Sequence, residues 1–362
     1  MNSIDLLFDE IERGRQGLNV GLSMGLPILE SYTYGVQRKT YTVIAGGTGS
    51  GKTSLALYSY VYRVIADHLG DMKYRVVFFS FEMPAPMLLA KLLSLHIWET
   101  YAMEVDYAAI MSRERALNDE LYNLIQSCKP WLEDFLKQLT IIDRAVSASA
   151  VYAALKGYAQ RNGTESTGEH GTIHYTPLVE GEIVQVVVDH LGLVKFESGS
   201  KKEEMDKLAN YLLSIRNMYS YSPLVLMQIN RTSSSMDRRK GGYSEIELSD
   251  LKDTGTAAEA AELVIALFNP WREKLRTHKD YNIQILQDHY RAIQILKSRL
   301  GQAEKSVGVN FFGSVGIFQE LPPAVELNRL SDNQIKKYTQ LVDIPDITPE
   351  LATPQGSFVF RL

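Results

Sequence analysis

The sequence predicts an α/β fold with a mostly parallel central sheet, helices on both faces of the sheet, and an antiparallel hairpin added on its C-terminal side. Short, continuous apolar runs alternate with longer amphipathic stretches, which is typical of buried parallel strands joined by helices. A glycine-rich segment follows the first of these buried runs, where a strand would pass into a helix. Later, two runs of alternating apolar and polar residues lie close together and indicate a hairpin.

The composition is that of an ordinary globular protein, with 45% hydrophobic and 22% charged residues in a chain of 362. The net charge of −5 excludes a polycation that coats nucleic acid with its whole surface, although a local basic groove is compatible with it. No apolar stretch approaches the roughly 18 residues of a membrane span, so we expect no membrane partner. The single cysteine, Cys128, excludes disulfide scaffolds and thiolate zinc sites within one chain and fits a reducing, cytoplasmic setting.

Residues 1–16 predict a short amphipathic helix ahead of the core. Ser3 is placed to cap this helix. The apolar positions that share one helix face are Ile4, Leu7, Phe8 and Ile11. Two interpretations stay open: the helix packs on its own domain, or it is an arm that docks on a neighbouring subunit.

The core is expected at residues 17–321. Its buried strands are predicted at Tyr41–Ala45, Arg75–Ser80, Ile183–Val188, Leu224–Gln228 and Leu263–Phe268. The helices between them are predicted at Ser54–Ala66, Pro86–Trp98, Val151–Arg161 and Glu203–Met218. Residues 162–180 are polar and glycine-rich, so we expect a surface loop there.

The last part of the core departs from this alternation. Asn282–Gln287 and Ala292–Lys297 predict a hairpin at the edge of the sheet, and Val307–Phe312 predicts one more strand. Residues 322–362 contain several prolines and no clear period, so we expect a tail that is partly disordered or that binds a partner.

The segment GGTGSGKT at Gly46–Thr53 meets the pattern G-x-x-x-x-G-K-[ST] and lies between a predicted strand and a predicted helix. Glycines let successive backbone N–H groups turn toward phosphates, and the following helix N-terminus adds partial positive charge. Lys52 is expected to contact the β- and γ-phosphates, and the Thr53 hydroxyl to bind Mg²⁺. The residues expected to hold the nucleotide are Gly46, Gly47, Thr48, Gly49, Ser50, Gly51, Lys52, Thr53 and Ser54. The chain is therefore predicted to be a P-loop nucleoside-triphosphatase.

Two carboxylates at the ends of predicted strands are candidates for chemistry at the phosphates. Asp189 ends the run VVVD, where P-loop enzymes hold Mg²⁺ through water. It is followed by His190, so the carboxylate that activates water must lie elsewhere. Glu82, in FSFEMP, would lie across the γ-phosphate and polarise water if its strand neighbours the P-loop strand. The alternative is a glutamate at a helix start that interacts with the helix dipole.

Three further polar residues lie at strand ends. Gln228 ends the run LVLMQ, where its amide is either a sensor of the γ-phosphate or an ordinary surface cap. Lys297 and Arg299 end a late predicted strand. They either reach the triphosphate of another subunit, where positive charge stabilises the transition state of hydrolysis, or are ordinary exposed cations.

Taken in order, these segments resemble the RecA-like core of the hexameric replicative DNA helicases of the DnaB family. The resemblance runs from about residue 17 to 321, and it is carried by the P-loop, FSFEMP, VVVDHLGLV, MQINR, LSDLKDTGTAAEAAELVIAL, LKSRLG and FFGSVGIFQEL. It implies a RecA-like P-loop fold and an ATP-dependent DNA helicase that uses ATP and Mg²⁺. The implied roles are phosphate and metal binding by Lys52 and Thr53, metal support by Asp189, general base catalysis by Glu82, γ-phosphate sensing by Gln228, and action in trans by Lys297 and Arg299.

The resemblance also implies a homo-oligomeric, hexameric ring that threads single-stranded DNA at a replication fork, with primase or other replisome proteins as partners. Loops after the metal-binding and sensor strands, 195–202 and 231–242, would grip the DNA backbone. The basic residues of these loops are Lys195, Lys201, Lys202, Arg231, Arg238, Arg239 and Lys240. The second loop is basic, glycine-containing and serine-rich, which suits sequence-independent phosphate contacts, although a surface loop of ordinary charge remains the alternative.

The sequence departs from the family pattern in two places. The family usually has tyrosine after the metal-binding aspartate and glutamine two residues later, whereas this chain has His190 and Gly192, so the roles of those side chains do not transfer. Cellular members carry a sizeable N-terminal domain, so the short helix here favours a bacteriophage or mobile-element protein of a bacterial host, or a trimmed motor.

Other functions share this core. One is a RecA/RadA-type recombinase that forms filaments, and another is a loader-like assembly ATPase that holds partner proteins. The presence of Lys52, Thr53, Glu82, Asp189 and Arg299 together argues against a catalytically dead ring.

Overall fold

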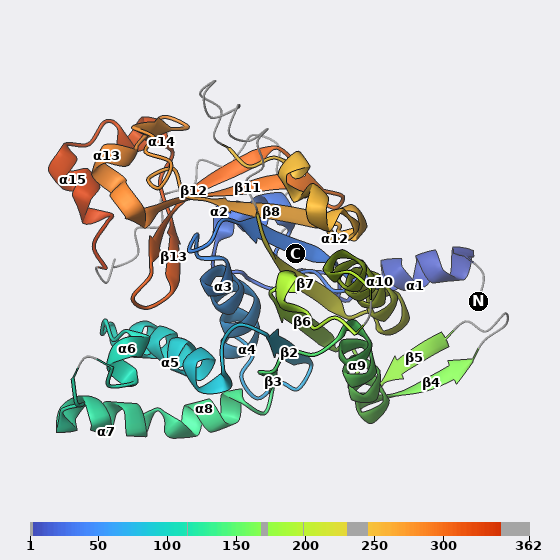
Figure 1. Cartoon of the computed structure of the whole chain (residues 1–362). Coiled ribbons are helices and arrows are strands. Elements are labelled where there is room, and N and C mark those ends of the chain that lie inside the picture. The colour runs from blue at the N-terminus through green and yellow to red at the C-terminus, as the bar shows by residue number, and fades with distance from the viewer. Residues whose placement is uncertain (1–2, 114, 168–172, 198, 230–244, 342–362) are drawn as a thin grey trace.

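The computed structural model describes residues 3–113, 115–167, 173–197, 199–229 and 245–341. At its centre lies a nine-stranded sheet with the order β13-β12-β11-β8-β1-β7-β6-β2-β3 (Figure 1). The strands are β1 Thr42–Gly46, β2 Tyr74–Ser80, β3 Leu139–Ile142, β6 Ile183–Asp189, β7 Ser222–Gln228, β8 Leu263–Phe268, β11 Tyr290–Ser298, β12 Lys305–Phe312 and β13 Ile317–Glu320. The strands from β8 to β3 are parallel, whereas β11, β12 and β13 form an antiparallel extension. The predicted fold class is confirmed.

Two layers of helices cover the sheet. One contains α9 Ala148–Asn162, α10 Lys201–Tyr219, α12 Gly255–Ala260 and α13 Ile283–Leu286. The other contains α2 Pro27–Thr33, α3 Lys52–Leu55, the π-helix η1 Ala56–Tyr62, α4 Arg63–Ala66, α5 Ala85–Tyr101 and α8 Lys129–Phe135. Alternate residues of β1 enter opposite layers, with Val43 and Ala45 in the first and Ile44 in the second. Every residue of β1 is buried, which explains why this strand is a continuous apolar run in the sequence.

The remaining elements lie between these or at the ends of the described chain. They are α1 Ser3–Arg15, α6 Tyr107–Ile110, α7 Asp119–Ser127, β4 Gly163–Thr167, β5 Ile173–Pro177, η3 Leu191–Leu193, η4 Leu248–Thr254, β9 Thr277–His278, β10 Tyr281–Asn282, η5 Gln287–His289, α14 Ala324–Leu327 and α15 Asp332–Lys337. In the part of the chain that the structure describes, we find no helix with both the length and the apolarity of a membrane span.

Two sequence predictions are wrong. Residues 162–180 are not a plain surface loop, because β4 and β5 pair as an antiparallel hairpin. The edge hairpin is formed by β11 and β12, not by Asn282–Gln287 with Ala292–Lys297. Within the first of those segments the Asn282 side chain accepts a hydrogen bond from the Gln284 N–H and so starts the short helix α13.

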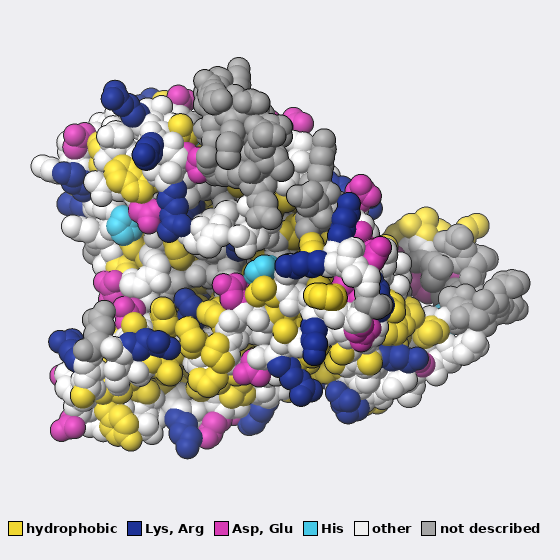
Figure 2. Space-filling model, viewed as in Figure 1, with side chains coloured by type: hydrophobic (Ala, Val, Ile, Leu, Met, Phe, Trp, Pro, Cys, Tyr) yellow, Lys and Arg dark blue, Asp and Glu magenta, His cyan; other side chains and the backbone are white. Residues whose placement is uncertain are grey.

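The N-terminal helix forms as predicted and extends away from the sheet and its covering helices (Figure 1). Its apolar residues Ile4, Leu7, Phe8 and Ile11 keep 55–65% of their surface exposed, and Figure 2 shows hydrophobic side chains on this projection. The Asn19 side chain joins the helix to the following turn by a 3.0 Å hydrogen bond to the Glu10 carbonyl. In the part of the chain that the structure describes, more than half of the surface of these apolar side chains therefore stays accessible. The side chain of the predicted cap, Ser3, lies outside the described residues.

The expected tail, residues 322–362, falls partly inside the described chain. The helices α14 and α15 pack through Leu327 and Ile335, which are 1% and 3% exposed. The Asn310 side chain of β12 donates a hydrogen bond to the Tyr338 carbonyl. Residues up to 341 thus belong to the packed structure on the β11–β13 side, and residues 342–362 lie outside the described residues.

Candidate nucleotide site

The glycine-rich loop lies at the carboxyl end of β1, in the centre of the sheet, and leads directly into α3. Gly49 and Gly51 have φ angles of +68° and +104°, which L residues with a Cβ atom rarely adopt. A Cβ atom on Gly46 would lie 2.7 Å from Ser50 Oγ and 2.9 Å from the Leu267 carbonyl. The loop therefore needs glycine at these positions for its backbone conformation and for its close packing on β8. This conformation and the helix N-terminus suit a phosphate chain.

The side chains of Lys52 and Thr53 lie at the start of α3 and contact the loop and the end of β6. Lys52 Nζ donates a 2.9 Å hydrogen bond to the Gly47 carbonyl across the loop. Burial lowers the pKa of Lys52, and the charges of Asp189 and Glu82 act against this shift. Thr53 Oγ1 donates a 2.9 Å hydrogen bond to Asp189 Oδ2. These groups fit a Mg²⁺ nucleotide, with the hydroxyl as a direct ligand and the carboxylate beside it.

Asp189 is 2% exposed at the carboxyl end of β6. Burial raises its pKa to about 6, partly offset by the hydrogen bond from Thr53 and by the charge of Lys52, while the charge of Glu82 adds to the rise. Within the described residues, no three His, Cys, Asp or Glu side chains gather to hold a metal by themselves.

Glu82 reaches the site by a route that the sequence prediction did not foresee. Its strand, β2, does not neighbour the P-loop strand, because β7 and β6 lie between them. Instead, β2 pairs with β6, so that Ser80 lies opposite Asp189 and the Phe81 N–H donates a 2.8 Å hydrogen bond to the Asp189 carbonyl. Glu82 follows directly and is exposed, and its charge acts on Lys52, Asp189 and His190. The two strands are therefore not neighbours, but Glu82 still follows the strand end that lies opposite Asp189.

The two positions at which the sequence departs from the family pattern contact each other. The Gly192 N–H donates a 3.2 Å hydrogen bond to His190 Nδ1, which caps η3. Burial lowers the pKa of His190, and the charges of Lys52 and Lys201 act in the same direction. At these positions the chain therefore forms a local turn rather than presenting two long polar side chains.

Gln228 lies at the carboxyl end of β7, directly beside the P-loop strand, with Gly46 as its partner in the register. Its Nε2 donates a 2.8 Å hydrogen bond to Thr48 Oγ1, so the amide contacts the phosphate loop itself. The loop that follows, with Arg231, Arg238, Arg239 and Lys240, lies outside the described residues. A sensor at Gln228 would thus be joined at one end to the phosphate loop and at the other to this basic segment.

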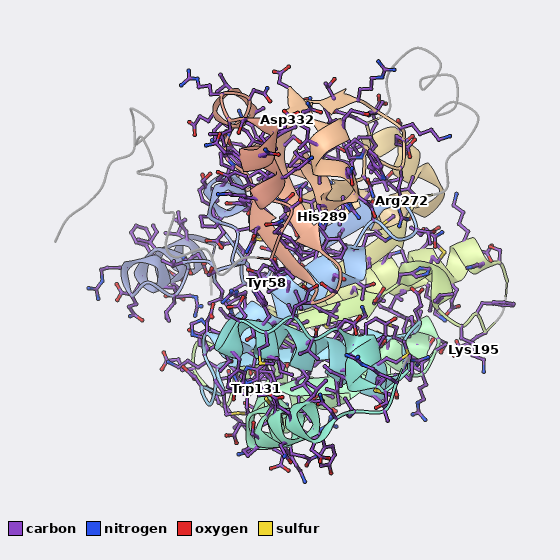
Figure 3. All side chains as sticks on the ribbon, turned by 90° about the vertical axis from the view of Figure 1, so that its left-hand side faces the viewer. Tyr58, Trp131, Lys195, Arg272, His289 and Asp332 are labelled. Atoms are coloured by element: carbon purple, nitrogen blue, oxygen red, sulfur yellow. The ribbon has the colours of Figure 1, made fainter. Side chains whose placement is uncertain are left out.

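The first basic loop is described except for residue 198. Lys195, Lys201 and Lys202 are exposed, and Figure 3 labels Lys195 on the same side of the molecule as Arg272. The Lys195 N–H donates a 3.1 Å hydrogen bond to the Val146 carbonyl, which ties the loop to the start of α9. A capping box between Ser200 and Glu203 fixes the start of α10. The loop therefore presents two lysines from the first turn of a firmly capped helix.

Lys297 and Arg299 lie at the opposite end of the sheet from the chain's own P-loop. Gly46 pairs with Leu267, and Leu267 pairs with Ile293, six residues before Arg299. This separation along β11 amounts to about 20 Å, farther than an arginine side chain reaches. Lys297 Nζ donates hydrogen bonds of 2.9 and 2.8 Å to the carbonyls of Ala258 and Glu259 in the last turn of α12. Neither cation can therefore complete the nucleotide site of its own chain.

Sequence reasoning missed two arginines that hold the P-loop from its outer side. Arg291 is 2% exposed on β11, and its Nε donates a 2.9 Å hydrogen bond to the Ser50 carbonyl. Arg272 Nη1 donates a 2.9 Å hydrogen bond to the Thr48 carbonyl and lines a cavity of about 230 Å³ beside the loop. Asp288 lies between the two guanidinium groups, 3.4 Å from Arg291 and 3.9 Å from Arg272. The sequence singled out neither residue: Arg291 is one of several polar residues of β11, and Arg272 lies in the segment between β8 and β9.

Comparison with known proteins agrees with this geometry. The sequence model of the family described as "DnaB-like helicase C terminal domain" matches residues 21–166 and 172–320. A probable replicative DNA helicase of Trieres chinensis is 23% identical over 278 residues, or 74% of this chain and 51% of that protein. The replicative DNA helicase DnaB of Rickettsia prowazekii is 23% identical over 257 residues, or 69% of this chain and 46% of that protein. The chain thus spans about half the length of these relatives.

Two solved structures share the fold. One, described as an ATPase domain, superimposes with a TM-score of 0.66 at 18% identity, covering 89% of this chain and 100% of that one. A DnaB-like replicative helicase, solved in a study of its interactions with primase, gives a TM-score of 0.65 at 19% identity, covering 89% of this chain and 68% of that one. Since the family model matches most of the chain, the chain belongs to the family of DnaB-like helicase C-terminal domains.

Proposed function

We propose that this chain is the ATP-hydrolysing motor of a ring-forming DNA helicase, which moves along single-stranded DNA and separates duplex at a replication fork. The observation that carries the proposal is the separation of two half-sites. The P-loop, Asp189 and Glu82 lie at one end of the sheet, whereas Lys297 and Arg299 lie at the other. A chain with this arrangement needs a neighbour in a head-to-tail assembly. Head-to-tail contacts close into a ring when the rotation between neighbours closes and continue as a filament when it does not, and we propose the ring.

In the proposed reaction, the Gly46–Ser54 segment binds the phosphates of ATP, and Lys52 neutralises charge on the β- and γ-phosphates. Thr53 and Asp189 would hold Mg²⁺, which would supply further positive charge at the phosphates. Glu82 accepts a proton from water while the water oxygen attacks the γ-phosphorus and the bond to the β–γ bridging oxygen breaks. Arg299 of the neighbouring subunit, with Lys297 beside it, stabilises the charge that spreads over the γ-phosphoryl group.

Gln228 is proposed to transmit the state of the γ-phosphate to the basic loop that follows it. The 2.8 Å hydrogen bond between Gln228 and Thr48 supports this role, because the amide touches the P-loop and Gln228 stands three residues before the basic loop begins at Arg231. Lys195, Lys201 and Lys202 of the first loop, and the basic residues of 231–242, would then contact DNA phosphates without regard to sequence. Each hydrolysis event would move the loops, and with them the bound strand.

We further propose that the ring is a hexamer in the bacterial cytoplasm, that α1 docks on the neighbouring copy, and that primase or another replisome protein is a partner. The uncovered apolar face of α1 supports docking between subunits. A test is Leu7→Asp with Phe8→Asp, which should reduce hexamers in native mass spectrometry and leave the melting temperature of the protomer unchanged. Unchanged assembly would contradict the docking role.

Complementation in mixed rings tests the shared site. Arg299→Ala and Lys52→Ala rings should each have almost no DNA-stimulated ATP hydrolysis. In an equimolar mixture, about one quarter of the interfaces combine an intact P-loop with an intact neighbouring arginine, so about one quarter of wild-type activity should return. The matched control mixes Lys52→Ala with Glu82→Gln, two defects on the same side of the interface, and should give no return. Failure of the first mixture to recover would refute the shared site.

Two alternatives remain distinct from this proposal in their products. A filament-forming recombinase would give helical filaments rather than rings in electron microscopy with ATP and single-stranded DNA. A loader-like assembly ATPase would not displace a strand from forked DNA. No described feature favours either one.

A further inference from the structure

Arg299 is exposed but not free in orientation. Its side chain keeps 56% of its surface accessible, and its Nη1 lies 3.6 Å from Glu262 Oε1. Its Nη2 donates a 3.3 Å hydrogen bond to the Glu259 carbonyl, and its backbone N–H donates a 2.8 Å hydrogen bond to the Glu262 carbonyl. Glu262 therefore holds this arginine both at the main chain and at the guanidinium.

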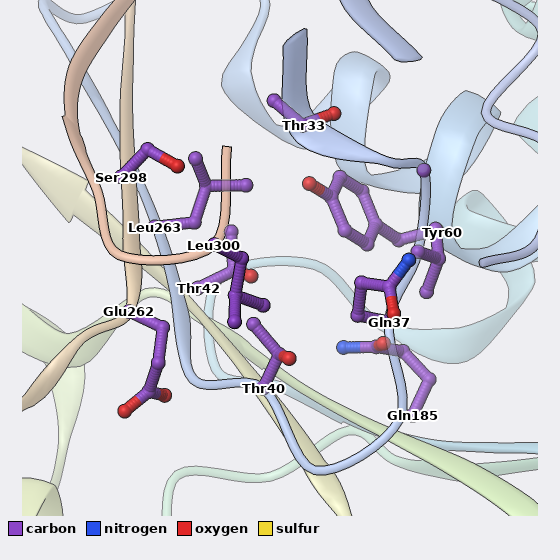
Figure 4. Close-up of a pocket in the computed structure, with 12 residues that line it drawn as sticks. Thr33, Gln37, Thr40, Thr42, Tyr60, Gln185, Glu262, Leu263, Ser298 and Leu300 are labelled. Carbon is purple, nitrogen blue, oxygen red and sulfur yellow. The ribbon is translucent and has the colours of Figure 1, made fainter. Parts of the chain in front are cut away.

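Glu262 is itself a buried junction, with 13% of its side chain exposed. Its Oε2 accepts a 2.8 Å hydrogen bond from the N–H of Tyr41, the residue before the P-loop strand. Its Oε1 accepts a hydrogen bond from Arg216 Nη1 in the last turn of α10 and also faces Arg299. Figure 4 shows Glu262 on the wall of a small cavity together with Thr40 and Thr42 from the start of β1 and Ser298 from the end of β11.

The charges around this carboxylate make it necessary for the placement of Arg299. Lys297 is already engaged with the carbonyls at the end of α12, and burial together with the charge of Arg299 lowers its pKa. Without the Glu262 carboxylate, the positive charges of Lys297, Arg299 and Arg216 would lie near one another and lose the largely buried negative charge between them. A flexible arginine would then sample many orientations, and a transition state is stabilised only by a group that is already in place.

We propose that Glu262 is a positioning residue for Arg299: its carboxylate holds the guanidinium at the outer end of β11, in the orientation that meets the triphosphate of the neighbouring subunit. This inference rests on the in-trans role of Arg299 given above. Arg216 shares the same carboxylate oxygen, so it sets how firmly Arg299 is held. Glu262 acts on hydrolysis in the neighbour and leaves nucleotide binding in its own P-loop unaffected.

A double-mutant cycle tests this role. Glu262→Gln keeps an acceptor for the Tyr41 N–H and removes the charge. In complete rings with single-stranded DNA, it should lower kcat for ATP about tenfold, with KM for ATP and the melting temperature close to wild type. In an Arg299→Ala background the same substitution should have no further effect on kcat, because its effect passes through Arg299. An equal fall in both backgrounds would overturn the proposal and assign Glu262 to the fold through Tyr41 or Arg216.

Two additional variants complete the design. Glu259→Gln, which removes an exposed carboxylate three residues earlier in the last turn of α12, is the matched control and should leave kcat unchanged. If Glu262→Gln melts well below wild type, the cycle is run with Glu262→Asp, which keeps the charge and retracts it; its smaller loss must likewise disappear without Arg299.

Mixed rings separate this inference from the proposed function. Glu262→Gln mixed with Lys52→Ala should recover activity above the level of either variant alone, because the defect lies on the arginine side of the interface. If Lys52→Ala recovers activity when mixed with Arg299→Ala but not when mixed with Glu262→Gln, the role of Glu262 is refuted and the shared site stands. Recovery with neither would refute the shared site itself.

Discussion

Arg75 and Glu182 form a buried ion pair at the starts of β2 and β6, the two strands whose other ends lead to Glu82 and Asp189. Their side chains are 7% and 2% exposed. Arg75 also donates a hydrogen bond to Asn162, and the hydroxyl of Tyr175 in the β4–β5 hairpin donates a 3.0 Å hydrogen bond to Glu182. The pair therefore fixes β2 and β6 at the end remote from Glu82 and Asp189.

Arg75→Met should destabilise the chain strongly at neutral pH, because it leaves the Glu182 carboxylate buried without its counter-charge. Removing one partner of such a pair costs about 3–5 kcal/mol, a large part of the roughly 5–15 kcal/mol that stabilises a domain. Replacing both partners, with Arg75→Met and Glu182→Leu, should cost less than about 1 kcal/mol, because the desolvation of both charges is removed as well. The described contacts thus predict a single variant that is much less stable than the double variant.

The pH dependence has a definite sign. Burial raises the pKa of Glu182 above its ordinary value, and the charge of Arg75 only partly opposes this. A carboxyl group whose pKa is raised by folding contributes its full stability below the ordinary value and loses it as the pH rises through the raised value. The double variant should therefore gain on the wild type as the pH rises through that window.

Urea unfolding of the complete chain without nucleotide, followed by tryptophan fluorescence from pH 5 to 8, measures these differences. Asp134→Asn, which breaks an exposed pair with Lys137, is the control and should cause no measurable change. Equal losses in the single and double variants would refute the reasoning, because the cost would then come from the lost pair and not from the unpaired charge.

Three further predictions concern the nucleotide site. Glu82→Gln should lower DNA-stimulated ATP hydrolysis by about 10²- to 10⁴-fold while binding of a fluorescent ATP analogue is retained; weakened binding would contradict its role as base. Burial raises the pKa of Asp189 from 3.8 to about 6, so the contribution of this group to stability is lost as the pH rises through about 6. Without metal, Asp189→Asn should therefore be about 2–3 kcal/mol more stable than wild type at pH 7–8 and nearly equal to it at pH 4. A stability difference that does not change with pH in denaturation curves would disprove this. Gln228→Ala should keep ATP binding and reduce strand displacement more than ATP hydrolysis, whereas equal losses in both assays would exclude a transmitting role.

The sequence predicted the sheet wherever strands are buried on both faces. Each residue of β1, β6 and β8 is buried, so these strands are continuous apolar runs that no other element imitates. The β4–β5 hairpin was missed because β4 (GTEST) is polar and shows no apolar alternation, while β5 alternates over only five residues, with Ile173 and Tyr175 as its larger apolar positions. The strand β3 was missed because it has four residues at the edge of the sheet.

Site residues that belong to one local sequence pattern could be predicted. Contacts between residues on different strands could not, because they depend on the order of strands in the sheet. The P-loop and Asp189 follow from local patterns. The order of strands does not follow from local patterns. Glu82 lies beside Asp189 because β2 pairs with β6 rather than with β1. Arg291 was missed because a charged residue within a strand normally faces water, whereas here the carbonyl of Ser50 and the ring of Phe311 surround its guanidinium.

The helix α10 has a consequence for how DNA and ATP act on each other. It begins at Lys201 and Lys202 and carries Arg216, bonded to Glu262, in its last turn. Roughly 22 Å of helix therefore separates the loop proposed to contact DNA from the carboxylate that contacts Arg299. A rigid helix of this kind makes its two ends move together. If DNA at the first end changes hydrolysis through the second, thermodynamic reciprocity requires ATP bound by the neighbour to change the affinity for DNA by the same free energy. The ring would then hold DNA most tightly at the interfaces whose nucleotide makes the best contact with Arg299.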